Sequence, residues 1–485
     1  MQHAKPAHIH WNTDLIRRYD LSGPRYTSYP TAPQFQENFA EADVTDAIAR
    51  SNASGRPLSL YLHIPFCDTI CYYCGCNKVV TANKQRARPY LDSLIREMAL
   101  RSAQFDHSRP VNQLHWGGGT PTYISDAEKR ELMDATRRYF NLRDDDSGEY
   151  SIEIHPGGTT PETLRVLREL GFNRLSMGVQ DFNPKVQQAV NRFNSFAEVK
   201  ALVDVARAEQ FHSLSMDLIY GLPHQTVGSV CHTLDQVIEL TPDRLSLFNY
   251  AHMPHLFKTQ KQMDEQALPS PATKLQILET AIHKLTHAGY VYIGMDHFAR
   301  PDDSLTLAQE RGLLQRNFQG YATHGNCDLL AMGVSSISAI DNIFVQNYKD
   351  IASYSRALDA GLTPVFKGLV LSRDDQIRQA VINQLICNFS LNFAELSQRL
   401  DIDFAAYFST ELEQLAAFDR DGLVKLGSSD LTVSDDGRLL IRRICMVFDA
   451  YLNNPTRSHD QLQAIRIPAE SDASGGGPER YSRII

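Results

Sequence analysis

The sequence feature that most constrains the fold is a regular alternation of strand-like and helix-like segments along residues 58–249. Short apolar runs with period-two alternation, which are typical of strands, occur at residues 58–64, 113–116, 151–155, 174–179, 214–219 and 244–249. The segments between them carry apolar residues at helical spacing, such as Tyr90, Leu91, Leu94 and Ile95. Strands separated by helices pair in parallel through right-handed crossovers. We therefore predict an α/β fold built on a partial (β/α)6 TIM-type barrel, with a doubly wound open sheet as the alternative.

The segments before and after this region do not show the same alternation of strands and helices. Residues 1–56 are predicted to form an ordered N-terminal arm, because Pro24 and Pro30 exclude a regular helix or a central strand around them. The catalytic barrel is predicted to span residues 57–365. Residues 366–470 are predicted to form a mainly helical C-terminal accessory domain, with helices at 375–388, 393–400 and 408–418 and a two-stranded wing at 422–426 and 431–433. Residues 471–485 contain a glycine-rich stretch and are predicted to be a linker and a terminal tail, whose last five residues could dock back.

Composition narrows the classes of function. The formal net charge of −9, from 48 basic and 57 acidic residues, argues against a non-specific nucleic-acid binder. The sequence has no export-type apolar run at its N-terminus and nowhere approaches the roughly 18 consecutive apolar residues of a membrane helix. We therefore expect a cytoplasmic protein with no membrane span and no nucleic-acid partner.

Four of the eight cysteines fall within ten residues, at Cys67, Cys71, Cys74 and Cys76. In a reducing compartment such a cluster indicates metal or redox chemistry and not a disulfide framework. The cluster directly follows the first predicted strand, and in a β/α barrel the loops at the carboxyl ends of the strands carry the chemistry. The cysteine loop is therefore the first candidate for a functional site.

Cys67, Cys71 and Cys74 are the predicted metal ligands. Thiolates suit both iron–sulfur clusters and zinc. Structural zinc prefers two well-separated pairs of ligands, whereas this chain has no second pair and Cys76 follows Cys74 across a single residue. Three thiolates can instead hold three irons of a 4Fe-4S cubane and leave the fourth iron open. A cluster is favoured, and a zinc-stabilised non-catalytic module or an unliganded loop are the alternatives.

Glycine and polar residues recur where the later strands end. The residues 117–119 are all glycine and allow the backbone to approach a ligand closely. Glu153 alternates with Ile152 and Ile154, so it is predicted to point inward. Further along the chain, at the fourth to sixth strands, come Gln180, Arg192, Asp217 and Ala251. Their common placement at one face of the barrel predicts a binding site.

The spacing Cys-x3-Cys-x2-Cys on the first loop of a β/α barrel resembles the radical S-adenosylmethionine superfamily. More narrowly, the chain is similar to the oxygen-independent coproporphyrinogen III oxidases in the segments CDTICYYCGCNK, PRYTSYPTA, LHWGGGTPTY, NRLSMGVQDFN, MDLIYGLP, LFNYAH and GMDHFARPDD. The similarity runs almost from end to end and includes the terminal YSRII. One departure is that this family usually reads Asp-Pro-Arg where the chain has His155-Pro156-Gly157, so an arginine that could meet an anionic group is missing there.

The resemblance implies an oxidoreductase of haem and porphyrin biosynthesis that uses a 4Fe-4S cluster and S-adenosylmethionine, the latter at two sites. Reductive cleavage of S-adenosylmethionine would give a 5′-deoxyadenosyl radical, which removes hydrogen from the β-carbon of a propionate side chain. Loss of carbon dioxide and one electron would leave a vinyl group, and two rounds would convert coproporphyrinogen III to protoporphyrinogen IX. The expected partners are coproporphyrinogen III and a low-potential electron donor, and the expected state is a monomer. A haem-binding or other tetrapyrrole-related member of the superfamily is the alternative.

The resemblance also implies roles for individual residues, although no acid or base is assigned. The cofactor bound to iron would be lined by Tyr61, Gly118, Glu153 and Ile337. A second S-adenosylmethionine, or the space that the substrate enters, would be lined by Tyr73, Gly119, Thr120, Gln180, Arg192, Asp217 and Ala251. The substrate carries four carboxylates while the protein is acidic, so a local cationic patch is needed. The candidates for substrate contacts are Arg25, Arg192 and Arg300, together with Cys76, whose role is not assigned.

Overall fold

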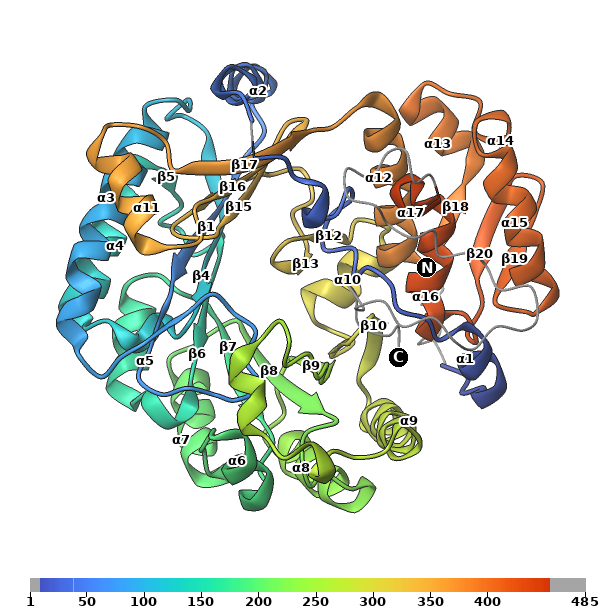
Figure 1. Ribbon diagram of the computed structural model, residues 1–485, viewed down its shortest axis with the longest axis horizontal. Coiled ribbons are helices and arrows are strands. Elements are labelled where there is room, and N and C mark those ends of the chain that lie inside the picture. Colours follow the sequence, from blue (N-terminus) through green and yellow to red (C-terminus); the bar gives the residue numbers. More distant parts are fainter. Residues whose placement is uncertain (1–8, 38, 454–485) are drawn as a thin grey trace. The chain divides into compact units, whose positions relative to one another are not determined.

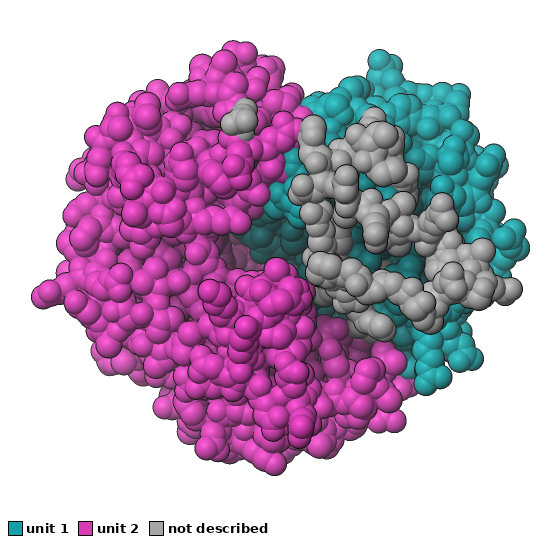
Figure 2. All heavy atoms as spheres, in the orientation of Figure 1, with its two compact units in different colours: residues 1–34, 291–325, 371–485 teal, residues 35–290, 326–370 magenta. Residues whose placement is uncertain are grey.

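Six parallel strands follow one another in chain order in the sheet of the computed structural model, which describes residues 9–37 and 39–453. The chain divides into two compact units: unit 1 comprises residues 1–34, 291–325 and 371–485, and unit 2 comprises residues 35–290 and 326–370 (Figure 2). The six strands belong to unit 2 and are β1 (Leu58–Ile64), β4 (Pro110–Gly118), β6 (Glu149–Ile154), β7 (Arg174–Gln180), β8 (Ser213–Tyr220) and β9 (Arg244–Asn249). Neighbouring strands in this series pair in parallel throughout. The predicted α/β fold with a partial (β/α)6 barrel is confirmed.

Helices connect these strands and lie along the outer side of the curved sheet (Figure 1). They are α3 (Arg88–Ser102), α4 (Asp126–Tyr139), α5 (Pro161–Glu169), α6 (Pro184–Val190), α7 (Phe196–Ala208) and α8 (Val227–Glu239), with α9 (Pro271–His287) following β9. Several begin at a strong capping signal: Ser125 caps α4 and Glu128 completes a reciprocal capping box, as Ser195 and Glu198 do on α7. These caps fix where each strand-end loop stops and each helix starts.

Alternation along the strands separates a buried face from a face that lines the interior. In β6, Tyr150, Ile152 and Ile154 are buried, while Ser151 and Glu153 keep part of their surface. The same pattern in β8 buries Met216 and leaves Asp217 partly accessible. Because successive side chains of a strand point to opposite faces, the polar residues all turn away from the helices. This places them on the concave side of the sheet.

The sheet continues beyond β1 into strands that were not predicted. On the other side of β1 lies β14 (Asp328–Met332), which is parallel to β1. Beyond it, the antiparallel strands are β15 (Ile337–Ile340), β16 (Ile343–Asn347) and β17 (Val365–Val370), and α2 (Glu41–Ser54) and α11 (Ile351–Asp359) complete unit 2. All five residues of β14 and all five of β16 are buried, so neither strand shows the alternation by which strands were recognised.

Unit 1 is mainly helical, as predicted for the C-terminal region. Its helices are α1 (Thr13–Tyr19), α10 (Ser304–Glu310), α12 (Arg373–Asn388), α13 (Phe393–Leu400), α14 (Phe404–Tyr407), α15 (Ser409–Arg420), α16 (Ile441–Cys445) and α17 (Ala450–Asn453). The predicted wing exists as β19 (Val424–Leu426) and β20 (Asp430–Val433), joined by a third strand, β18 (Ser390–Asn392). Two further hairpins pair β10 (Val291–Gly294) with β11 (His297–Ala299) and β12 (Gln315–Asn317) with β13 (Gly320–Ala322).

The predicted domain boundaries at residues 56, 365 and 470 stay predictions. The two units group segments by contact and not by continuity along the chain, since residues 291–325 belong with residues 371–485. The predicted linker and terminal tail lie outside the described residues. In the part of the chain that the structure describes, each helix is too short or too polar to cross a membrane.

Candidate active site

The cysteine loop opens onto a cavity at the carboxyl ends of the barrel strands. The loop leaves β1 through β2 (Phe66–Cys67), which pairs in parallel with β3 (Val79–Val80). Cys67, Cys71 and Cys74 are free thiols of intermediate burial, and all three line a cavity of about 360 Å³. Cys76 lines the same cavity and is exposed. The structure therefore gathers the four clustered cysteines around one space.

Hydrogen bonds tie the cysteine loop to the end of α6. The amide of Tyr72 donates to the carbonyl oxygen of Val190 at 3.0 Å, and the side-chain amide of Asn191 donates to the carbonyl oxygen of Ile70 at 2.7 Å. Asn191 itself adopts a left-handed conformation with φ of 51°, which ends α6 and turns the next residue, Arg192, back into the cavity. The loop and the turn after α6 are thus held together by two bonds.

Donors and cations surround the cysteine sulfurs. Thr120 Oγ1 donates to Cys67 Sγ at 3.6 Å, and Arg192 Nη1 donates to Cys71 Sγ at 3.7 Å. Burial raises the pKa of Cys67 to about 11, although the bond from Thr120 opposes this. At Cys74, a hydrogen bond from the thiol of Cys76 and the charge of Lys78 lower the pKa to about 6 against the effect of burial. Such donors stabilise sulfur in its anionic, metal-binding form.

The glycine turn after β4 closes one side of the cavity. The amide of Gly119 donates to the carbonyl oxygen of Ile64 at 2.9 Å, and a Cβ at this position would lie 2.7 Å from the carbonyl oxygen of Pro65. Gly118 has a φ of 119°, a conformation that side chains rarely allow. Both positions need glycine because the turn lies directly against the start of the cysteine loop.

Glu153 is held by two groups of the neighbouring strand β4. Its Oε1 lies 3.2 Å from Nε2 of His115, and its Oε2 accepts a bond from the amide of Gly118 at 3.2 Å. Burial works against ionisation, but His115, the Gly118 amide and His63 together hold the pKa of Glu153 below its usual value. The side chain keeps 43% of its surface exposed, towards the cavity that it lines. Glu153 is therefore a fixed carboxylate facing the cavity.

Asp217 is the second carboxylate of the cavity and behaves differently. Burial raises its pKa to about 6, although hydrogen bonds from Ser176, at 2.9 Å, and Ser246 favour the ionised form. The negative charge of Glu153 also contributes to the increase. The cavity therefore holds two carboxylates of different acidity. Glu153 ionises readily, whereas Asp217 ionises only near neutral pH.

Arg192 and Gln180 also line the cavity. Besides its bond to Cys71, Arg192 donates through Nη2 to the carbonyl oxygen of Gly178 at 2.5 Å. A Cβ on Gly178 would lie 2.7 Å from that guanidinium and 2.8 Å from the amide of Gln180, so both side chains pack onto a bare stretch of β7. Gln180 has a φ of 67° where the pairing of β7 with β8 shifts register. Residues held in such conformations cluster at functional sites.

Comparisons with known proteins agree with this geometry. The family model of the radical SAM superfamily matches residues 61–237, and that of the HemN C-terminal domain matches residues 371–440. The oxygen-independent coproporphyrinogen III oxidase of Pseudomonas aeruginosa is 52% identical over 449 residues, which cover 93% of this chain and 98% of the relative. That of Escherichia coli is 50% identical and is covered to 97%.

A solved structure gives the same result. Coproporphyrinogen III oxidase (HemN) from Escherichia coli, described as a radical SAM enzyme, superposes with a TM-score of 0.87 at 49% identity, covering 92% of this chain and all of the other. The chain belongs to the oxygen-independent coproporphyrinogen III oxidases. Membership of this radical SAM family implies a 4Fe-4S cluster and S-adenosylmethionine.

The residues of the cavity fit these two groups. Three thiols on one loop receive bonds or charge from Thr120, Arg192 and Lys78, which suits an anionic cluster. The Nε of Arg192 is buried and has no hydrogen-bond partner in the described chain, so a donor remains for a ligand. Among the described residues, no three His, Cys, Asp or Glu side chains converge closely enough to hold a single metal ion. A cubane does not need such convergence, because each thiolate binds its own iron.

Most of the other predicted site residues also meet at this cavity: Tyr73, Gly118, Gly119, Thr120, Glu153, Gln180, Arg192 and Asp217 all line it. Three do not line it. Tyr61 lies behind it, where its hydroxyl bonds to His63 Nδ1 at 3.1 Å; the carbonyl oxygen of Ala251 accepts a bond from Gln260; and Ile337 begins β15.

The candidate substrate arginines Arg25 and Arg300 belong to unit 1. Arg25 forms an ion pair with Asp296 at 2.9 Å, and Arg300 pairs with Asp302 at 3.2 Å while 44% of its side chain is exposed.

Sequence reasoning did not single out His115 or Lys78. His115 sits between the buried Leu114 and Trp116 in β4, so the alternation that revealed Glu153 would also have revealed it.

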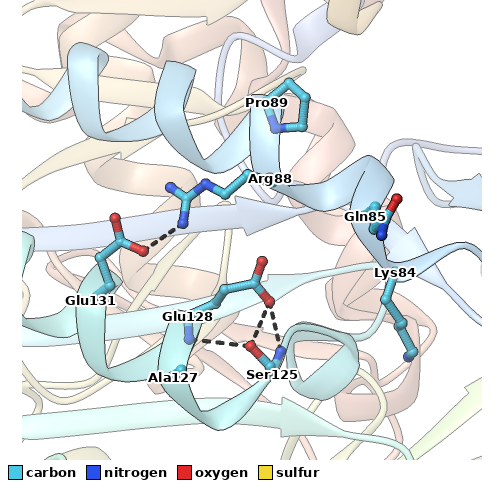
Figure 3. Close-up of a pocket in the computed structure, with 8 residues that line it drawn as sticks. All are labelled: Lys84, Gln85, Arg88, Pro89, Ser125, Ala127, Glu128 and Glu131. Carbon is cyan, nitrogen blue, oxygen red and sulfur yellow. Dashed lines mark hydrogen bonds and ion pairs between the residues drawn. The ribbon is translucent and has the colours of Figure 1, made fainter.

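A second hollow, of about 720 Å³, lies on unit 2 between the start of α3 and the start of α4 (Figure 3). Four of its polar side chains are occupied with one another. Arg88 pairs with Glu131, and Ser125 exchanges hydrogen bonds with Glu128 as the cap of α4. We assign it no catalytic role.

Proposed function

We propose that the protein catalyses the oxygen-independent oxidative decarboxylation of two propionate side chains of coproporphyrinogen III to vinyl groups, giving protoporphyrinogen IX. The observation that carries this proposal is the set of three free thiols on one loop, each facing a single cavity at the carboxyl ends of the barrel strands. Family membership supplies the reaction class, and the cavity supplies a place for it.

Cys67, Cys71 and Cys74 would hold the cluster. When bound, the cluster and S-adenosylmethionine supply an electron and a 5′-deoxyadenosyl radical that removes hydrogen from the propionate β-carbon. Each substrate radical would then lose carbon dioxide and pass one electron to an external electron acceptor, which balances the formation of each vinyl group. The electron donor is expected to be a low-potential carrier, and a monomer in the cytoplasm stays our prediction.

The protein's own contribution is placement and exclusion of water. Glu153 has a pKa below its usual value and accepts a bond from the amide of Gly118, which suits the ammonium group of the cofactor on iron; Tyr61 and Ile337 complete the proposed set. Gln180, Arg192 and Asp217, with Tyr73, Gly119, Thr120 and Ala251, would receive a second S-adenosylmethionine or the entering substrate. Arg192 suits a carboxylate there, because its Nε remains available for a charge-assisted bond.

The test is a product assay under anaerobic conditions. Protein with a reconstituted cluster is given S-adenosylmethionine, dithionite and coproporphyrinogen III, and the tetrapyrroles are analysed by mass spectrometry. We expect a product that has lost two carbon dioxide units, with 5′-deoxyadenosine and methionine formed alongside it, and no product from the Cys71→Ala variant. Cofactor cleavage without decarboxylation, or stoichiometric haem binding alone, would refute the proposal.

A further inference from the structure

His115 connects Glu153, the carboxylate proposed to face the cofactor, to the neighbouring strands of the barrel. It lies on β4, with its ring between Tyr61 of β1 and the polar side chains of β6. Nδ1 is 2.5 Å from Oγ of Ser151, and Nε2 is 3.2 Å from Oε1 of Glu153. Both nitrogens of the imidazole are therefore engaged, and neither is free to turn towards another partner.

Stacking fixes the plane of the same ring. The rings of Tyr61 and His115 are nearly parallel, with 5.7 Å between their centroids and 14° between their planes. The Tyr61 ring is held in turn by the bond from its hydroxyl to His63. His115 is thus constrained at its face and at both nitrogens, so the direction of its Nε2 is set by three strands of the barrel.

This constraint determines how Glu153 presents its oxygens. Oε1 is directed by His115 and Oε2 by the amide of Gly118, so each oxygen uses one acceptor position on the protein. A carboxylate oxygen has two such positions, which leaves one on each oxygen for a ligand in the cavity. Gly117 permits the arrangement, because a Cβ there would lie 2.8 Å from Oε1 of Glu153 and 3.0 Å from Nε2 of His115.

We propose that His115 is a positioning residue that orients Glu153 to accept a primary ammonium group. This inference deepens the proposed function and rests on it, because the ammonium would be that of the methionyl part of S-adenosylmethionine. His115 does not line the cavity itself and acts only through the carboxylate. Its influence on the charge of Glu153 points the same way, since His115 helps to lower the pKa of that carboxyl.

Equilibrium binding of S-adenosylmethionine to the cluster-loaded protein, without reductant, tests this role. His115→Leu removes the bond and should weaken binding about tenfold, the usual effect of losing a hydrogen bond to a charged group. His115→Gln keeps a donor and should stay within about threefold of the parent. His212→Leu is the matched control, because His212 also pairs with a carboxylate, Asp146 at 3.0 Å, but that carboxylate does not line the cavity.

A double-mutant cycle separates positioning from general damage. In a Glu153→Gln background the carboxylate is absent, so adding His115→Leu should cause little further loss of affinity. Equal losses in both backgrounds, or a His115→Leu variant that binds like the parent, would overturn the inference while leaving the proposed function intact. If the parent itself fails to bind S-adenosylmethionine, the proposed function and this inference both fail.

Discussion

Arg192 and Cys71, which both line the cavity, are joined by a hydrogen bond in which Nη1 lies 3.7 Å from the sulfur. A cation this close to a cluster ligand stabilises the more negative, reduced form of the cluster. The bond therefore couples the turn after α6 to the redox properties of the cysteine loop.

We expect Arg192→Gln to lower the reduction potential of the reconstituted cluster, because the positive charge beside Cys71 is lost. Arg192→Lys keeps the charge without the planar donor set and should lower it less. A redox titration followed by electron paramagnetic resonance, without S-adenosylmethionine, measures the change. Equal potentials in the parent and in Arg192→Gln would contradict the assignment.

Substitution of Cys71 and substitution of Cys76 should have different effects on the cluster. Cys71→Ala removes a proposed cluster ligand and should abolish bound iron and sulfide together with turnover. Cys76→Ala removes only the thiol that bonds to Cys74, and should keep the cluster. Iron and sulfide analysis with visible absorption decides between them. A Cys76→Ala protein without iron would show that the ligand set is wrong.

Two adjacent glycines offer a matched pair for the turn after β6. A Cβ on Gly157 would clash with the carbonyl oxygen of Phe193, whereas the nearest neighbour of a Cβ on Gly158 is His155 Nδ1 at an ordinary 3.7 Å. We expect Gly157→Ala to lower the free energy of unfolding by about 1–3 kcal/mol, because the turn after α6 must move. Gly158→Ala should change it by less than about 0.5 kcal/mol. Denaturant unfolding of both variants measures the difference, and similar losses would refute the proposed contact.

Asp217 gives the cavity a pH dependence with a definite sign. Its pKa is about 6 in the folded protein, above the value of 3.8 for a free side chain, so the folded state holds the proton more tightly. The contribution of Asp217 to stability is present below about pH 4 and is lost as pH rises through about 6. Asp217→Asn should therefore gain stability relative to the parent across this window, by about 3 kcal/mol. Unfolding curves that stay parallel from pH 4 to pH 7 would contradict this.

The sequence predicts the barrel well where strands alternate. The bounds of β1 and β9 coincide with the predicted segments, and the other four strands differ by a few residues at their ends. The strands β14 and β16 were not predicted because both are buried on both faces and have no period-two signal. The grouping of residues 291–325 with residues 371–485 in one unit was not predicted, because spacing along the chain gives no information on contacts between distant segments.

The candidate site could be predicted as far as side chains follow strand ends. Glu153 and Asp217 were found from alternation and placement, and both line the cavity. The bonds of His115 to Ser151 and Glu153 could not be predicted from the sequence, because they depend on the register between β4 and β6. Register across parallel strands is set by packing of the whole sheet and not by local sequence.

The two bonds between the cysteine loop and the end of α6 have a consequence for assembly of the enzyme. Because Tyr72 and Asn191 fasten the two segments to each other, whatever stiffens one also stiffens the other. Binding of iron by the cysteines would therefore restrain not only their own loop but also the turn that carries Arg192.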